Sequence, residues 1–124
     1  MSRNLIGALL ATIALPLAAA ELTIAQIAPF SGPLAPTGSH LRAGAQLYFD
    51  AVNAKGGVHG NKLRLISKDD GYKVEETVRL VRETIAEAQP IALFGAVGTG
   101  NVEALIKEKV VETAGVPLIS VRTG

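Results

Sequence analysis

Short apolar runs alternate with longer stretches of helical periodicity along residues 21–124, and this alternation restricts the fold more than any other feature. The runs are bounded by glycine, proline, asparagine or aspartate, and the longer stretches carry apolar residues at spacings of three and four. Strands are expected at residues 22–28, 63–69, 91–94 and 116–121. Helices are expected at residues 38–55, 74–88 and 99–114. Such alternation with short connections is typical of a parallel sheet with right-handed crossovers.

The expected sheet is covered by helices on both faces. Residues 91–94 and 116–119 are apolar without strict alternation, as strands buried on two sides are. Gly115 is expected to end the third helix, and Thr99 or Asn101 is a candidate N-cap for it. The predicted fold class is therefore α/β, a parallel sheet with helices on both faces.

The printed sequence ends at Gly124, directly after the fourth expected strand. Without a further helix, one face of the sheet would be partly uncovered and an edge strand would be exposed. We therefore expect this chain to be the N-terminal part of a longer protein.

The first twenty residues have the pattern of a secretory signal peptide. Arg3 precedes an apolar stretch at residues 5–17, and residues 18–20 are alanines, the small side chains that a signal peptidase requires. The uncharged stretch is shorter than the roughly 20 residues that cross a bilayer, and no cysteine follows that could carry a lipid. We expect cleavage near Glu21 and release of a soluble chain into the periplasm. An N-terminal membrane anchor is the alternative.

The composition excludes several classes of partner. Without residues 1–20 the chain has eleven basic and eleven acidic residues, scattered singly, so neither nucleic acid nor a membrane surface is an expected partner. His40 and His59 have no neighbouring ligands at metal-binding spacing, and the chain has no cysteine. Asp69 and Asp70 could be metal ligands or a phosphoacceptor pair, but a solvated turn suits them better. No metal and no cofactor are expected.

The candidate binding site lies at the carboxyl ends of the expected strands, where ligands bind in open parallel sheets. Helix N-termini at that edge present unpaired N–H groups and partial positive charge, which favour anions. The loops that reach it are 28–39, 69–73, 96–101 and 122–124.

The loop at 96–101 suits a carboxylate best. Gly98 and Gly100 allow the backbone to approach a ligand closely, and Thr99 adds a hydroxyl group. The glycines also suit a tight turn alone, and Thr99 also suits an N-cap. Tyr72 could line the cleft or pack beneath it.

Four segments carry a resemblance to a known family. They read IAPFSGP at 27–33, NAKGGVHG at 53–60, DDGY at 69–72 and FGAVGT at 94–99. In their order and spacing they resemble the periplasmic solute-binding proteins of the leucine/isoleucine/valine type, the receptors of branched-chain amino acid ABC importers. The resemblance covers the chain behind the expected signal peptide at 1–20, and it implies that residues 21–124 are part of the first lobe of a two-lobed type I periplasmic binding protein.

The resemblance also implies that the protein binds a ligand and does not catalyse a reaction. Such a receptor captures an amino acid or another small carboxylate by hinge closure and passes it to a permease complex in the inner membrane. Thr99 stands where the family holds the ligand carboxylate, and residues 120–124 lie where a further loop contacts the ligand. Residues 121–124 (VRTG) depart from the small-residue pattern of the amino acid binders, and Arg122 could add a carboxylate contact or lie on the surface. The expected ligand-binding residues are Ser31, Tyr72, Gly98, Thr99, Gly100, Arg122 and Thr123.

Two other functions are open. The ligand-binding ectodomain of a membrane sensor would use the same lobes and would need a membrane helix downstream of Gly124. An exported Rossmann-type enzyme is the other, since residues 98–100 begin like a dinucleotide fingerprint. However, Glu103 replaces the third glycine, and no acidic residue lies about 20 positions on. No hydrolase, phosphoryl-transfer or zinc-protease motif is present, so we expect no enzymatic activity.

Overall fold

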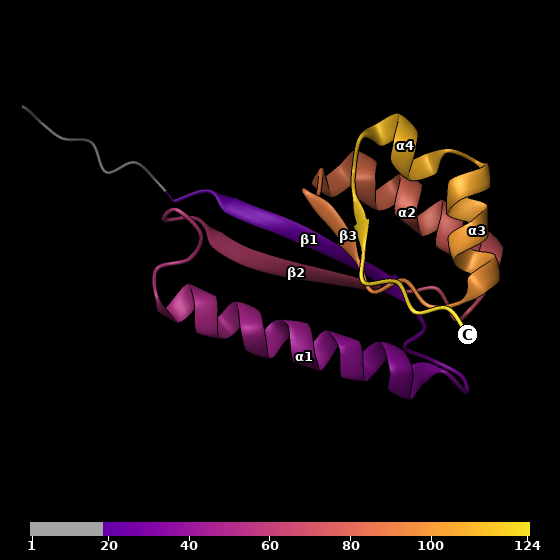
Figure 1. Ribbon diagram of the computed structural model, residues 1–124, viewed down its shortest axis with the longest axis horizontal. Helices are drawn as coiled ribbons and strands as arrows, with labels where there is room; N and C mark the ends of the chain where they lie inside the picture. The colour runs from indigo at the N-terminus through magenta and orange to yellow at the C-terminus, as the bar shows by residue number, and fades with distance from the viewer. Residues whose placement is uncertain (1–18) are drawn as a thin grey trace, which may run out of the picture.

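The computed structural model describes residues 19–124 (Figure 1). Its strands are β1 (Glu21–Ala28), β2 (Lys62–Asp69), β3 (Ala92–Phe94) and β4 (Leu118–Ile119). Its helices are α1 (Ala35–Ala54), α2 (Val74–Ala88), α3 (Thr99–Lys107) and α4 (Val110–Ala114). Residues 1–18 of the expected signal peptide lie outside the described part of the chain.

The four strands form one parallel sheet in the order β2-β1-β3-β4. β1 pairs with β2 along its whole length, from Glu21 beside Lys62 to Ala28 beside Asp69. The order reverses between β1 and β3, because the chain leaves β1 towards β2 on one side and later returns to β3 on the other. A reversal of this kind opens a crevice at the carboxyl ends of the two strands.

Helices cover both faces of the sheet, so the predicted α/β architecture is confirmed (Figure 1). The side chains of β1 alternate between these faces. Gln26 points to α1, where its Nε2 donates to the carbonyl oxygen of Gly38 at 3.3 Å. Ala25 and Ile27 point to the other face, into the main core. That core consists of Ala25, Ile27, Val78, Leu80, Val81, Leu93, Leu105 and Val110.

The ends of several elements differ from those that the sequence predicts. α1 begins at Ala35, before the expected Gly38, because the fixed φ of Pro36 fits the first turn of a helix. The third expected helix is divided in two, since Lys109 adopts the left-handed conformation with φ of 52°. The N-cap of α3 is Gly98, not Thr99 or Asn101. The fourth strand covers two residues of the expected run.

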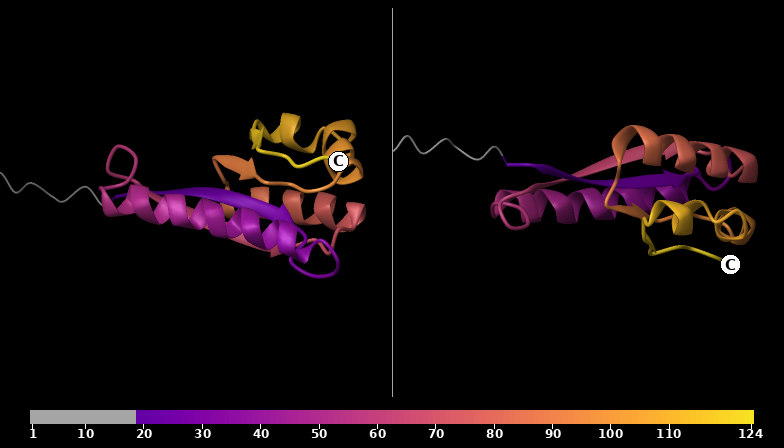
Figure 2. Two further views of the ribbon diagram at one scale, coloured as in Figure 1. Left: turned by 60° about the horizontal axis from the view of Figure 1, so that its bottom comes forward. Right: turned by 90° about the horizontal axis from the view of Figure 1, so that it is seen from above.

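The two ends of the described chain lie far apart. Figures 1 and 2 place the last residues beside the first turn of α3, at the opposite end of the molecule from residue 19. Within residues 19–124, no helix combines the length and the apolar character that a membrane span needs.

Candidate ligand-binding site

A cleft of about 250 Å³ lies at the carboxyl edge of the sheet, where the strand order reverses. Each of the four loops expected at that edge contributes to it. The lining residues are Leu34, Thr37, Tyr72, Val97, Gly98, Arg122, Thr123 and Gly124. Four of the seven expected ligand-binding residues are therefore among them, namely Tyr72, Gly98, Arg122 and Thr123.

Backbone hydrogen bonds join two of these loops. The N–H of Gly98 donates to the carbonyl oxygen of Arg122 at 2.9 Å, and the N–H of Arg122 donates to that of Ala96 at 2.8 Å. The segment after β4 thus runs as an extension of the sheet alongside the loop before α3, with Val97 opposite Arg122.

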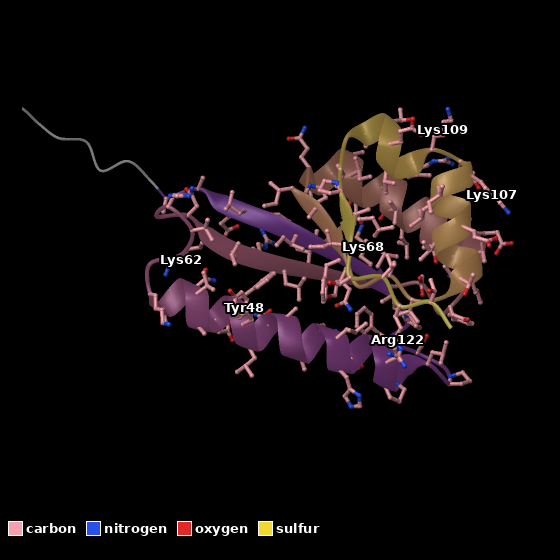
Figure 3. The ribbon with its side chains drawn as sticks, viewed as in Figure 1. Tyr48, Lys62, Lys68, Lys107, Lys109 and Arg122 are labelled. Atoms are coloured by element: carbon pink, nitrogen blue, oxygen red, sulfur yellow. The ribbon has the colours of Figure 1, made fainter. Side chains whose placement is uncertain are left out.

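The guanidinium group of Arg122 provides positive charge at the cleft. Figure 3 shows Arg122 between the C-terminal segment and the N-terminal end of α1. It also lines an adjoining cleft of about 340 Å³ together with Thr37, His40 and Leu41. Arg122 is exposed and forms no salt bridge with any residue from 19 to 124, so its charge is available to an anion.

Thr99 and Gly100 lie beside the cleft in the first turn of α3. The Thr99 hydroxyl donates to the carbonyl oxygen of Gly124, a lining residue, at 3.4 Å. The first N–H groups of a helix have no acceptor within the helix itself, and no side chain in the described part of the chain caps α3. The exposed backbone of Thr99 and Gly100 therefore offers N–H donors beside Arg122.

Tyr72 lines the cleft and also packs on a neighbouring loop. It adopts the left-handed conformation with φ of 63°, and its N–H donates to Oδ1 of Asp70 at 2.9 Å. A Cβ placed on Gly98 would lie 2.6 Å from Cε2 of Tyr72. Tyr72 thus both lines the cleft and packs against the loop that precedes α3.

Ser31 is not among the lining residues, although it follows β1 at the same edge. It lies instead by the end of β2, where its Oγ is 3.7 Å from a Cβ placed on Gly71. Hydrogen bonds from the N–H of Phe30 and from Ser31 lower the pKa of Asp69 there. Because Asp69, at the end of β2, bonds to Phe30 and Ser31, the side chain of Ser31 lies towards β2 and not towards the cleft.

Leu34 and Thr37 line the cleft, although neither is among the residues that the sequence predicts for the site. Both lie in the expected loop 28–39, but the sequence of this long loop does not indicate which of its residues line the cleft. The early start of α1 decides this, because it places Leu34 at the N-cap and Thr37 in the first turn. Proline at position 36 was the available signal.

Two carboxylates, Asp69 and Asp70, stand at the end of β2, directly before the turn that carries Tyr72. Among residues 19–124, no three His, Cys, Asp or Glu side chains gather closely enough to hold a metal ion. Asp69 accepts from the N–H groups of Phe30 at 2.8 Å and Gly71 at 2.9 Å, as a turn residue does. Asp70 is only 2% exposed, and burial raises its pKa.

The parallel sheet, the reversal of its strand order and the cleft at its carboxyl edge are those of a lobe of an α/β binding protein. The family model described as "Periplasmic binding protein" matches residues 21–124, and the chain belongs to this family.

Known proteins of this kind resemble the chain in sequence and in structure. The Leu/Ile/Val-binding protein homolog 7 of Brucella abortus is 33% identical over 100 residues, which are 81% of this chain and 24% of the relative. A substrate-binding periplasmic protein from Ralstonia solanacearum has a TM-score of 0.79 and 46% identity over 81% of this chain and 28% of its own. The chain thus spans about a quarter of the length of the relatives it matches.

Two further solved structures contain ligands. The branched-chain amino acid transporter substrate binding protein LivJ from Streptococcus pneumoniae, in complex with isoleucine, has a TM-score of 0.75 and 28% identity over 83% of this chain and 29% of its own. The solute binding protein of an ABC transporter from Rhodopseudomonas palustris, in complex with 3,4-dihydroxybenzoic acid, has a TM-score of 0.72 and 28% identity over 84% of this chain and 28% of its own.

Proposed function

We propose that the chain belongs to the extracytoplasmic substrate-binding component of an ABC importer, which binds an amino acid or another small carboxylate by hinge closure. In this proposal residues 1–20 direct export to the periplasm, and residues 21–124 form the first part of lobe 1. The single observation that carries the proposal is the cleft at the strand-order reversal, where Arg122 and the uncapped start of α3 converge in a member of this family.

The chemistry of the cleft favours a carboxylate as the group that is bound. Arg122 supplies a guanidinium group with donors in the planar fork that matches a carboxylate. The first turn of α3 supplies N–H donors and the positive end of the helix dipole, and Thr99 supplies a hydroxyl. Tyr72 supplies an aromatic side chain against which the body of a ligand can pack.

The ligands of two structural relatives also favour a carboxylate as the group that is bound. Isoleucine and 3,4-dihydroxybenzoic acid differ in shape and in the rest of their polar groups, but both carry a carboxylate. A first lobe that binds the carboxylate, and leaves the rest of the ligand to other parts of the protein, would accommodate either class. The permease partnership is proposed on the transporter titles of these relatives.

The test is isothermal titration of the full-length exported protein with amino acids and with aromatic and aliphatic acids, including L-isoleucine and 3,4-dihydroxybenzoate. We expect saturable binding of at least one carboxylate, and no binding of the corresponding amide. Absence of binding to every carboxylate, together with turnover of a substrate, would contradict the proposal. Loss of uptake of the bound compound after deletion of the gene tests the transport role separately.

A further inference from the structure

Three buried polar side chains form a connected cluster behind the cleft. We call Asp70, Thr77 and Asn101 the Asp70 cluster; they are 2%, 0% and 3% exposed. The Thr77 hydroxyl donates to Oδ2 of Asp70 at 2.6 Å and accepts from Nδ2 of Asn101 at 2.7 Å. Polar groups this deeply buried are costly unless they are paired, so this chain of hydrogen bonds is strongly favoured over its broken forms.

One end of the cluster holds Tyr72. The second carboxylate oxygen of Asp70, Oδ1, accepts from the N–H of Tyr72 at 2.9 Å. Tyr72 is in the left-handed conformation, which is unfavourable for a bulky residue and needs support from its surroundings. Its side chain lines the cleft. Asp70 therefore fixes the backbone of one wall directly.

The other end of the cluster holds the first turn of α3. Asn101 lies two residues after Thr99, and its side chain reaches across to Thr77 of α2. Its Oδ1 is also 2.5 Å from the place of a Cβ on Gly98. Since no side chain in residues 19–124 caps α3, this link to α2 fixes the turn and leaves its N–H groups uncovered.

We propose that Asp70 is a positioning residue that fixes two walls of the cleft, Tyr72 directly and the first turn of α3 through Thr77 and Asn101. The proposal rests on the proposed function in one respect, namely that these walls bind a carboxylate. Asp70 itself does not touch the ligand. Its role is to hold the donors of α3 and the ring of Tyr72 in one arrangement before the ligand arrives, which reduces the ordering cost of binding.

The first test measures backbone hydrogen exchange in the full-length protein and needs no ligand. Thr77→Val keeps the side-chain shape and removes the hydroxyl, which bonds to Asp70 and Asn101 and also lies 3.1 Å from the carbonyl oxygen of Lys73 in the same helix turn, whereas Thr77→Ser keeps the hydroxyl. Thr84→Val is the matched control, because Thr84 lies on the same helix, is 1% exposed, and its hydroxyl oxygen has no partner within residues 19–124. We expect faster exchange across residues 95–105 in Thr77→Val only, and wild-type exchange in Thr77→Ser and Thr84→Val.

Exchange that stays unchanged in Thr77→Val, or that rises equally throughout the protein, would overturn the proposal. If Thr77→Val does not fold, Asn101→Ala decides instead. That variant removes the link to α3 and leaves the bond between Thr77 and Asp70 in place, so it should accelerate exchange in the same segment.

The second test measures affinity by titration with L-isoleucine and with 3,4-dihydroxybenzoate. For a probe that the wild type binds, we expect Thr77→Val to bind about 5- to 30-fold more weakly, the effect of losing one or two buried hydrogen bonds. Thr77→Ser should restore most of the affinity, and Thr84→Val should match the wild type. Equal affinities in Thr77→Val and Thr84→Val would overturn the positioning role. If the wild type binds neither probe, the two ligands are rejected, and the exchange measurement still decides the proposal.

Discussion

The ring of Tyr72 occupies the space that a side chain at residue 98 would need. A Cβ on Gly98 would lie 2.6 Å from Cε2 of Tyr72, and Gly98 has φ of 105°. The β2–α2 turn and the β3–α3 loop are therefore in contact at a position where a residue other than glycine would be strained. Both residues of this contact line the cleft.

Gly98→Ala should disturb both the fold and the cleft. A methyl group there meets Tyr72 and Asn101, and alanine is strained at this φ, so we expect a loss of about 1 to 3 kcal/mol in the free energy of unfolding. Chemical denaturation measures it. Gly44→Ala is the control, because Gly44 lies within α1 in open space and alanine should stabilise the helix by about 0.5 to 1 kcal/mol. Equal effects of the two substitutions would show that the contact is unimportant.

Thr99→Val should weaken carboxylate binding without unfolding the protein. Valine keeps the shape of threonine but leaves a charged acceptor without its hydroxyl partner, which we expect to cost about 1 to 3 kcal/mol of binding free energy. Titration with the ligand of the wild type measures this. Thr113→Val, at an exposed position of α4, serves as the control and should bind normally. Unchanged affinity in Thr99→Val would remove Thr99 from the site.

Arg122→Gln should weaken binding and reduce its dependence on salt. The substitution removes a positive charge that is unpaired within the described chain, so we expect a loss of about 1.5 to 3 kcal/mol for a carboxylate ligand. Because salt screens exposed charges, the affinity of the wild type should fall more steeply between low and high ionic strength than that of the variant. Arg64→Gln, which alters an exposed pair with Glu21 on β1, is the control. Parallel salt dependence in wild type and Arg122→Gln would contradict a direct contact.

Asp69 should make the protein less stable in acid. Hydrogen bonds, first from the N–H of Phe30, lower its pKa in the folded state below the ordinary value of 3.8. A carboxylate of this kind stabilises the fold above its unfolded pKa, and the contribution is lost as pH falls through the folded pKa. The free energy of unfolding should therefore decline from about pH 5 downwards, and less so in Asp69→Asn. Denaturant titrations at several pH values measure both slopes, and identical slopes would exclude Asp69 as the cause.

The sequence was sufficient for the architecture because the sheet and helices follow from periodicity. Apolar strands and helical stripes gave the α/β class, and the carboxyl ends of the strands gave the edge where the cleft lies. Four expected residues line that cleft because each lies in the short loop that follows a strand. The position of these loops is predicted by the local sequence patterns that mark where each strand ends and the next helix begins.

The remaining features depend on contacts between distant residues. Ser31 is drawn to Asp69 on another strand, and Asn101 bonds to Thr77 instead of capping α3. No local pattern indicates either pairing. The division between α3 and α4 arises at Lys109, a residue type that rarely adopts the left-handed conformation and gives no warning of it.

The two hydrogen bonds between Ala96, Gly98 and Arg122 mean that the loop before α3 and the segment after β4 cannot shift independently. A substitution that redirects the backbone at residue 121 or 122 will tilt the start of α3 as well. Among related binding proteins, a substitution near residue 98 and one near residue 122 should accordingly be inherited together despite their separation along the chain.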